Sequence, residues 1–112
     1  MDNLEEYRSI IEKVLLEYTK IPYAHGDLRT EAVFDRVRDR YLLMNVGWDK
    51  GKRVHGSIAH ADIIDDKIWV QYDGLEEGLA VELIRAGIPK ELVVLGFRTP
   101  EARKHIDYSL VS

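Results

Sequence analysis

The sequence predicts a two-layer α+β fold, in which an antiparallel four-stranded β-meander packs against an N-terminal helix and a second helix. Three observations predict it. Apolar residues recur every three or four positions in the first 18 residues, the period changes to two between residues 28 and 72, and a second helical stripe follows. The predicted order is α-β-β-β-β-α with a mixed C-terminal tail, and we expect residues 1–112 to form one domain.

The first helix is the most clearly patterned segment. Its apolar stripe contains Leu4, Tyr7, Ile11, Val14 and Tyr18, and charged residues occupy the opposite side. A proline at position 22 ends the helix, because the residue before a proline is pushed out of the α region. We expect the stripe to cover the sheet, although its spacing would also suit packing against a partner helix.

Four strands are predicted from alternating apolar and polar residues separated by short turn sequences. The first contains Ala32 and Phe34, and the others span residues 41–48, 53–64 and 67–72. Turns are expected at residues 37–39, 49–52 and 65–66. Three consecutive short connections favour antiparallel neighbours, hence a meander.

The second helix and the tail are marked by capping residues. Asp73 is the predicted N-cap, and Leu79 and Leu83 belong to the buried stripe. Gly87, with a proline two positions later, marks the C-terminal end. Residues 93–97 fit either a short strand or a packed loop, and Thr99 before a proline begins a last helical turn.

Composition excludes several classes of site. The chain has 46% apolar and 32% charged residues, which is typical of globular proteins. The absence of cysteine rules out disulfides, thiolate nucleophiles and cysteine-based zinc sites. The N-terminus is acidic where a signal peptide is basic, and no apolar run reaches the roughly 20 residues of a membrane helix, so we expect a cytoplasmic protein. A net charge of −4 opposes non-specific attraction to nucleic acid.

The third predicted strand carries the clearest candidate site. Alternation places His60 and Asp62 on one face, where they could act as an acid–base pair or as two metal ligands. The alternative, which we favour, is that they are structural and hydrogen-bond to each other or to Asn45 and Gln71 across the sheet. The same alternation turns Ser57 to the opposite face, which argues against a Ser57–His60–Asp62 triad. The residues predict no metal and no cofactor.

A second candidate is a basic patch near two hairpin ends. Arg36, Arg38, Arg40 and Arg53 could contact phosphates. Interleaved aspartates largely cancel this charge, so we favour solvated turns and expect no direct contact with DNA.

Several motifs together resemble one known family. They occur in order along the chain, as Val46-Gly-Trp48, Arg53-Val-His-Gly56, His60-Ala-Asp62, Asp66-Lys-Ile-Trp-Val-Gln71, Asp73-Gly-Leu-Glu76, Gly87-Ile-Pro-Lys-Glu91 and Val94-Leu-Gly-Phe97. The chain is similar in these motifs to the XisI family, the cyanobacterial fdxN-element excision controlling factors. An aspartate at position 66, where a glycine would be usual, departs from the pattern.

The resemblance implies an accessory role beside a site-specific recombinase that removes a DNA element, together with a nuclease-like partner of the XisH type. It carries over no catalytic residues. Two hypotheses follow: a regulatory protein that binds the nuclease-like partner, and a small enzyme or ligand-binding module that uses His60 and Asp62. We also expect a homodimer, because a meander leaves two edge strands and a sheet face bearing tryptophan and tyrosine.

Overall fold

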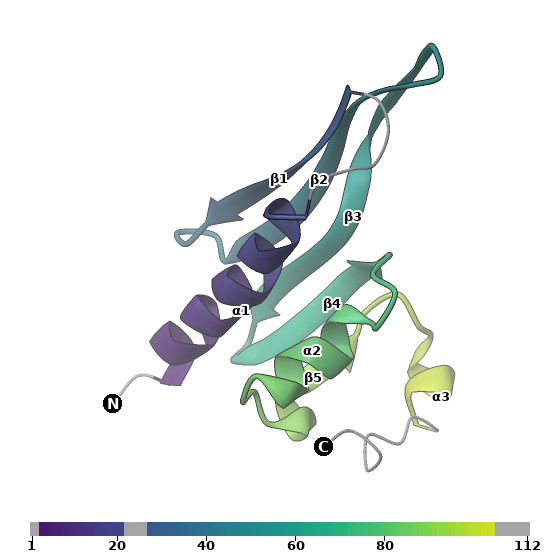
Figure 1. Ribbon diagram of the computed structural model, residues 1–112. Coiled ribbons are helices and arrows are strands. Elements are labelled where there is room, and N and C mark those ends of the chain that lie inside the picture. Colours follow the sequence, from purple (N-terminus) through teal and green to yellow (C-terminus); the bar gives the residue numbers. More distant parts are fainter. Residues whose placement is uncertain (1–2, 22–26, 105–112) are drawn as a thin grey trace.

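The computed structural model describes residues 3–21 and 27–104, and the chain in these ranges forms an α+β fold of two layers (Figure 1). The elements are α1 (Asn3–Thr19), β1 (Asp27–Asp35), β2 (Arg40–Asp49), β3 (Lys52–Ile64), β4 (Lys67–Asp73), α2 (Leu79–Arg85), a 3-10 turn η1 (Lys90–Leu92), β5 (Val93–Leu95) and α3 (Pro100–Arg103). None of the described helices is long and apolar enough to cross a membrane.

The sheet has five strands in the order β1-β2-β3-β4-β5. The first four are antiparallel neighbours, as the meander predicts. The predicted strand count is one short, because the segment left open between strand and loop pairs in parallel with β4 as β5. Both two-residue turns, Lys50-Gly51 and Asp65-Asp66, have positive φ at each residue, and such turns match the twist of antiparallel strands.

Two irregularities modify the alternation of the strands. Leu43 pairs with Ala59 and Met44 with Ser57, so Ile58 is an extra residue in β3. A second register shift, between the pairs His60–Tyr72 and Ala61–Val70, makes Gln71 an extra residue in β4. These are β-bulges, and each changes which side chains share a face beyond it.

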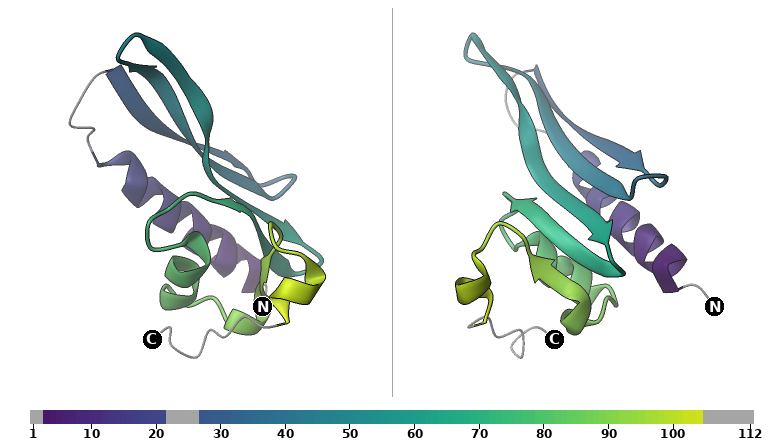
Figure 2. Two further views of the ribbon diagram at one scale, coloured as in Figure 1. Left: turned by 90° about the vertical axis from the view of Figure 1, so that its right-hand side faces the viewer. Right: turned by 180° about the vertical axis from the view of Figure 1, so that it is seen from behind.

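The core lies between the sheet and the two longer helices. It contains residues from every layer that are at most 9% exposed, among them Ile11, Leu15, Tyr41, Leu43, Ala59, Ala61, Ile68, Val70, Leu79, Leu83 and Leu95. The first helix therefore covers the sheet with its apolar stripe, as expected. Viewed from behind, the sheet is in front of both α1 and α2, so these helices cover the same face (Figure 2).

Capping of the second helix differs from the prediction. The helix begins at Leu79 with Gly78 as N-cap, and Asp73 is the last residue of β4. The Asp73 carboxylate nevertheless accepts hydrogen bonds from the backbone N–H groups of Leu75 and Leu79, at 3.2 and 2.7 Å, so it stabilises the helix start from a distance. The C-terminal end is as predicted, because Gly87 has a φ of +121°.

The molecule is elongated. Its radius of gyration is 14.8 Å, compared with about 13 Å for a compact chain of this length. The β2–β3 hairpin accounts for part of this shape, since it extends beyond the end of α1 (Figure 1).

Candidate functional site

His60 and Asp62 lie on the sheet face that α1 and α2 leave uncovered. His60 is opposite Leu42 and Tyr72, and Asp62 is opposite Arg40 and Trp69. The two residues are also hydrogen-bonded to each other, because His60 Nε2 is 2.7 Å from Asp62 Oδ1.

Asp62 is the one buried charged residue among those that the structure describes. Its side chain is 7% exposed, and both carboxylate oxygens have partners. Gln71 Nε2 donates to Oδ2 at 3.3 Å, and Arg40 Nε lies 3.7 Å from Oδ1. A buried carboxylate needs such donors, and the arginine compensates its charge.

The C-terminal segment covers the β4 side of this cluster. An added Cβ at Gly96 would lie 2.6 Å from Gln71 Oε1, so the backbone approaches that side chain closely. The Arg103 guanidinium stacks 5.5 Å from the centre of the Trp69 ring and donates to the carbonyls of Leu95 and Arg98. The cluster is thus closed on one side, while the His60 side chain remains 29% exposed.

The bulge at Ile58 changes the position of Ser57. Ser57 pairs with Met44, which is on the same face of β2 as Leu42, the partner of His60. The prediction that Ser57 faces away from His60 is therefore wrong, because it assumed strict alternation. Ser57 Oγ donates to the carbonyl of Ala59 at 3.3 Å, and so it does not complete a hydrogen-bonded triad with His60.

Of the two predicted cross-strand partners, Gln71 contacts Asp62 and Asn45 does not. Asn45 is opposite Gly56, on the other face of β2, and its buried Oδ1 has no hydrogen-bond partner among the described residues. The described ranges also bring together no group of three or more His, Asp or Glu side chains that could hold a metal ion.

The predicted basic patch is divided: Arg36, Arg38 and Arg40 lie at the β1–β2 turn, each beside a different acidic partner, and Arg53 is distant from them. Arg36 bonds to Glu5 and Glu12 on α1, and Arg38 pairs with Asp35 at 3.1 Å. Arg40 lies beside Asp62, whereas Arg53 stacks on Trp48 at the other end of β2, with 5.4 Å between its guanidinium carbon and the ring centre.

A separate ion-pair network joins α1 to the β1–β2 turn. Arg8 bonds to both carboxylate oxygens of Asp39, at 2.7 and 3.2 Å, and the Tyr41 hydroxyl donates to the same carboxylate at 3.0 Å. The Arg8 hydrogen bonds hold the pKa of Asp39 below its usual value. Burial, followed by the bond to Asp39, raises the pKa of Tyr41 above its usual value.

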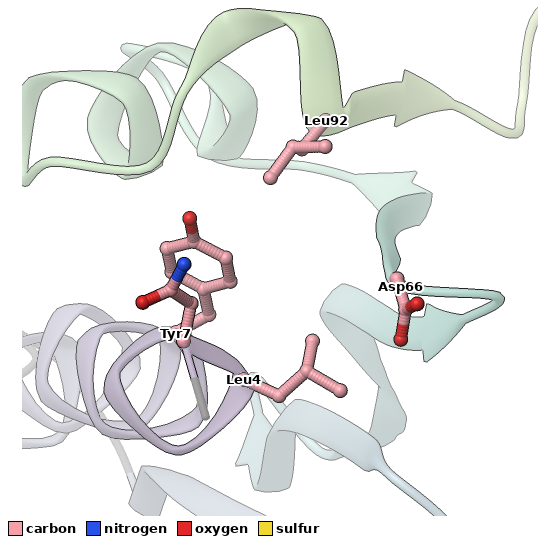
Figure 3. A pocket seen from close by; sticks show the side chains of 5 residues that line it. Leu4, Tyr7, Asp66 and Leu92 are labelled. Carbon is pink, nitrogen blue, oxygen red and sulfur yellow. The ribbon is translucent and has the colours of Figure 1, made fainter. Parts of the chain in front are cut away.

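The helix layer carries a groove that no single motif predicted. Three adjacent hollows, of about 290 to 310 Å³ each, follow α1 and are lined by Leu4, Tyr7, Ile10, Val14, Tyr18 and Ile21. In the first, Leu4 and Tyr7 lie across from Leu92, with Asp66 to one side (Figure 3). We call this series of hollows the α1 groove.

The rim of the α1 groove is mainly acidic. Asp66, Glu17 and Glu82 line it with a single lysine, Lys13. The Tyr18 hydroxyl donates to Glu82, and burial together with this bond raises the pKa of Tyr18 above its usual value. The signal in the sequence was the apolar stripe of the first helix, because Leu4, Tyr7, Val14 and Tyr18 belong to it and also line these hollows.

Comparisons with known proteins match the chain over nearly its whole length. Residues 1–110 match the family model described as XisI protein. The crystal structure of a XisI-like protein from Anabaena variabilis has 34% sequence identity and a TM-score of 0.84, covering 94% of this chain and 96% of that one. The fdxN element excision controlling factor XisI from the same organism has 32% identity and a TM-score of 0.76, covering 91% and 99%. No curated protein matches the chain.

Proposed function

The chain belongs to the XisI family, and from this premise we propose that it is a non-catalytic accessory protein of programmed DNA-element excision that binds a nuclease-like partner of the XisH type. The observation that carries the proposal is the whole-chain similarity to a protein described as an excision controlling factor. We place this activity in the cytoplasm and assign it to residues 1–112 as one domain.

The α1 groove supports the binding part of the proposal. Its hollows are spaced along the chain from Leu4 to Ile21, about 25 Å at the rise of an α-helix, which matches the length of a partner helix of four to five turns. The acidic rim would favour lysine and arginine beside the apolar face of that helix. A basic, nucleic-acid-binding partner would carry such residues.

The test is a titration of the purified chain with a purified XisH-type protein, by size-exclusion chromatography and calorimetry. We expect a complex at micromolar concentrations and a loss of about tenfold or more in affinity for Ile21→Asp, because Ile21 lines the groove and is 60% exposed. Leu16→Asp is the matched control, since Leu16 is on α1 and 42% exposed but lines none of the three hollows. Two folded proteins that do not associate would refute the proposal.

A second candidate function is a small enzyme or ligand-binding module. The favouring observation is the 2.7 Å contact between a partly exposed His60 ring and a buried carboxylate, because a carboxylate so placed fixes the orientation of an imidazole. The neighbouring Gln71 and Arg40, which also bind the carboxylate, support the structural role that we favour.

A further inference from the structure

The uncovered face of the sheet has an unusual composition. An antiparallel sheet with one free face normally places polar residues on that face. In β2 the four consecutive positions that share the face with His60 are instead Leu42, Met44, Val46 and Trp48. We call these four residues the β2 stripe.

The β2 stripe contains half-buried Leu42 and Met44, buried Val46 and exposed Trp48, and apolar residues continue on the neighbouring strands. Val33 on β1 is opposite Leu42, and Tyr72 is opposite His60 in the same cross-strand row. Val33, Trp48 and Tyr72 are each about half exposed, at 51%, 50% and 52%. Exposed apolar surface that is contiguous and bordered by polar side chains is typical of a binding interface.

The described part of the chain does not cover this area. The helices α1 and α2 are both on the opposite side of the sheet (Figure 2). The segment around α3 reaches only Trp69 and Gln71 at the β4 side. Within the described ranges, Leu42, Met44 and Trp48 of the stripe are at least partly exposed, whereas Val46 is 9% exposed.

The residues that flank the stripe on β1 and β3 indicate what kind of molecule would cover it. Row by row, Asp27 and Arg53 flank Trp48, Arg29 and His55 flank Val46, and Glu31 and Ser57 flank Met44. The Trp48 row thus has opposite charges on its two flanks, and in the next row Arg29 is neutralised by Glu31 at 2.8 Å. A surface with a central apolar stripe and opposite charges on the two sides of one row is complementary to itself at that row.

We propose that a second copy of this chain covers the free sheet face, with β2 over β2 and a two-fold axis along the β2 stripe. This rotation places apolar residues over apolar residues and brings each β1 flank over the β3 flank of the other copy. Asp27 then faces Arg53 of the second copy. The contact is isologous, as in most small homodimers, and it uses the side of the sheet opposite to the α1 groove.

The size of the face suits such a contact. β2 has ten residues, which span about 33 Å, and the axes of strands β1 to β4 cover about 15 Å at the usual spacing. With its side chains, this area is of the same order as the roughly 800 Å² that each partner contributes to a standard interface.

Cross-linking tests the geometry directly, because the chain contains no cysteine and each introduced thiol is unique. Facing sheets are about 10 Å apart, too far for a disulfide, so the reagent is a short bismaleimide. We expect Met44→Cys to give a covalent dimer at high yield. Val37→Cys, which is 92% exposed in the β1–β2 turn, should give almost none at the same protein concentration.

Light scattering provides the second measurement. The wild-type chain should have twice its mass of 13.0 kDa, Met44→Lys should have the monomer mass with unchanged circular dichroism, and Val37→Lys should remain dimeric. A monomeric wild type, or a Met44→Lys variant that stays dimeric, would overturn the proposal. So would protection of the Met44→Cys thiol by the nuclease-like partner or by single-stranded DNA instead of by a second copy. The wild-type mass is measured without the partner, so failure here is distinct from failure of partner binding.

Discussion

At the scale of single residues, the most informative side chains are carboxylates whose partners come from several different helices, strands or turns. Asp62 gathers His60, Gln71 and Arg40 from three strands, and Asp39 joins the β1–β2 turn to Arg8 on α1. Each arrangement combines burial with more than one donor, and removing either carboxylate leaves donors without an acceptor.

Asp62 distinguishes the two candidate functions. If it is structural, Asp62→Ala should lower the free energy of unfolding by about 1–3 kcal/mol, because buried donors lose their acceptor. Partner binding should then decrease only as far as the folded fraction does. Urea denaturation followed by a binding titration measures both quantities.

The variant Asp62→Asn keeps the shape of the side chain and removes its charge. A variant that retains wild-type stability and partner binding, but loses binding of a small ligand or a catalytic activity, would support the second function over the first.

Asp39 makes stability dependent on pH. Its pKa in the folded state is lowered by Arg8, so its contribution is present above its unfolded pKa of about 4 and is lost as the pH falls through the folded value. Asparagine tolerates the positive φ of 56° at this position, so Asp39→Asn removes only the charge.

At neutral pH we expect Asp39→Asn to be less stable than the wild type by about 1–2 kcal/mol, through weaker charge-assisted hydrogen bonds. The difference should shrink as the pH is lowered below about 4. Denaturation curves at several pH values test this, and a difference that stays constant down to acid pH would show that the charge is not responsible.

At the scale of elements, the order of the helices and strands could be predicted from the sequence. Which side chains share a face of a strand could be predicted only in part. Alternation correctly placed His60 and Asp62 together, but it misplaced Ser57 because the extra residue Ile58 has no signature of its own. The fifth strand was left open because three apolar residues fit a strand or a loop equally well, and only pairing with β4 decides between them.

The close approach of β1 and β2 at the Leu28–Gly47 pair depends on Gly47. Its φ is +147°, and an added Cβ would lie 1.9 Å from the carbonyl oxygen of Asp27, which is backbone and cannot move aside easily. Gly47→Ala should therefore cost about 2–4 kcal/mol of stability.

Gly56, opposite Asn45 in the same sheet, is the matched control because an added Cβ there meets nothing within 4 Å. Gly56→Ala should be neutral or stabilising by up to about 1 kcal/mol, since alanine reduces the entropy of the unfolded chain. Thermal or urea unfolding of both variants tests this, and similar losses of stability would contradict the proposed role of Gly47.

At the scale of the whole molecule, the sheet separates two surfaces. Figure 2 shows α1 and α2 on one side of the sheet. The α1 groove is therefore on that side, and the β2 stripe is on the opposite face. The apolar stripe of the first helix was the sequence feature that indicated the groove. The stripe covers the sheet, and some of its residues also line the hollows beside the helix. The partners of Arg36 on α1 and of Arg40 on β3 were not predictable, because they are distant in sequence.

The strand order also bears on how the protein is made. Each strand lies beside the one that precedes it in the chain, so the sheet can grow one strand at a time as the polypeptide leaves the ribosome. The exception is the interval between β4 and β5, which are separated by about 20 residues including α2. During that interval β4 is an unpaired edge with the apolar residues Ile68 and Val70, and such an edge favours aggregation. A nascent chain that stops before residue 93 is therefore the form of this protein most in need of a chaperone.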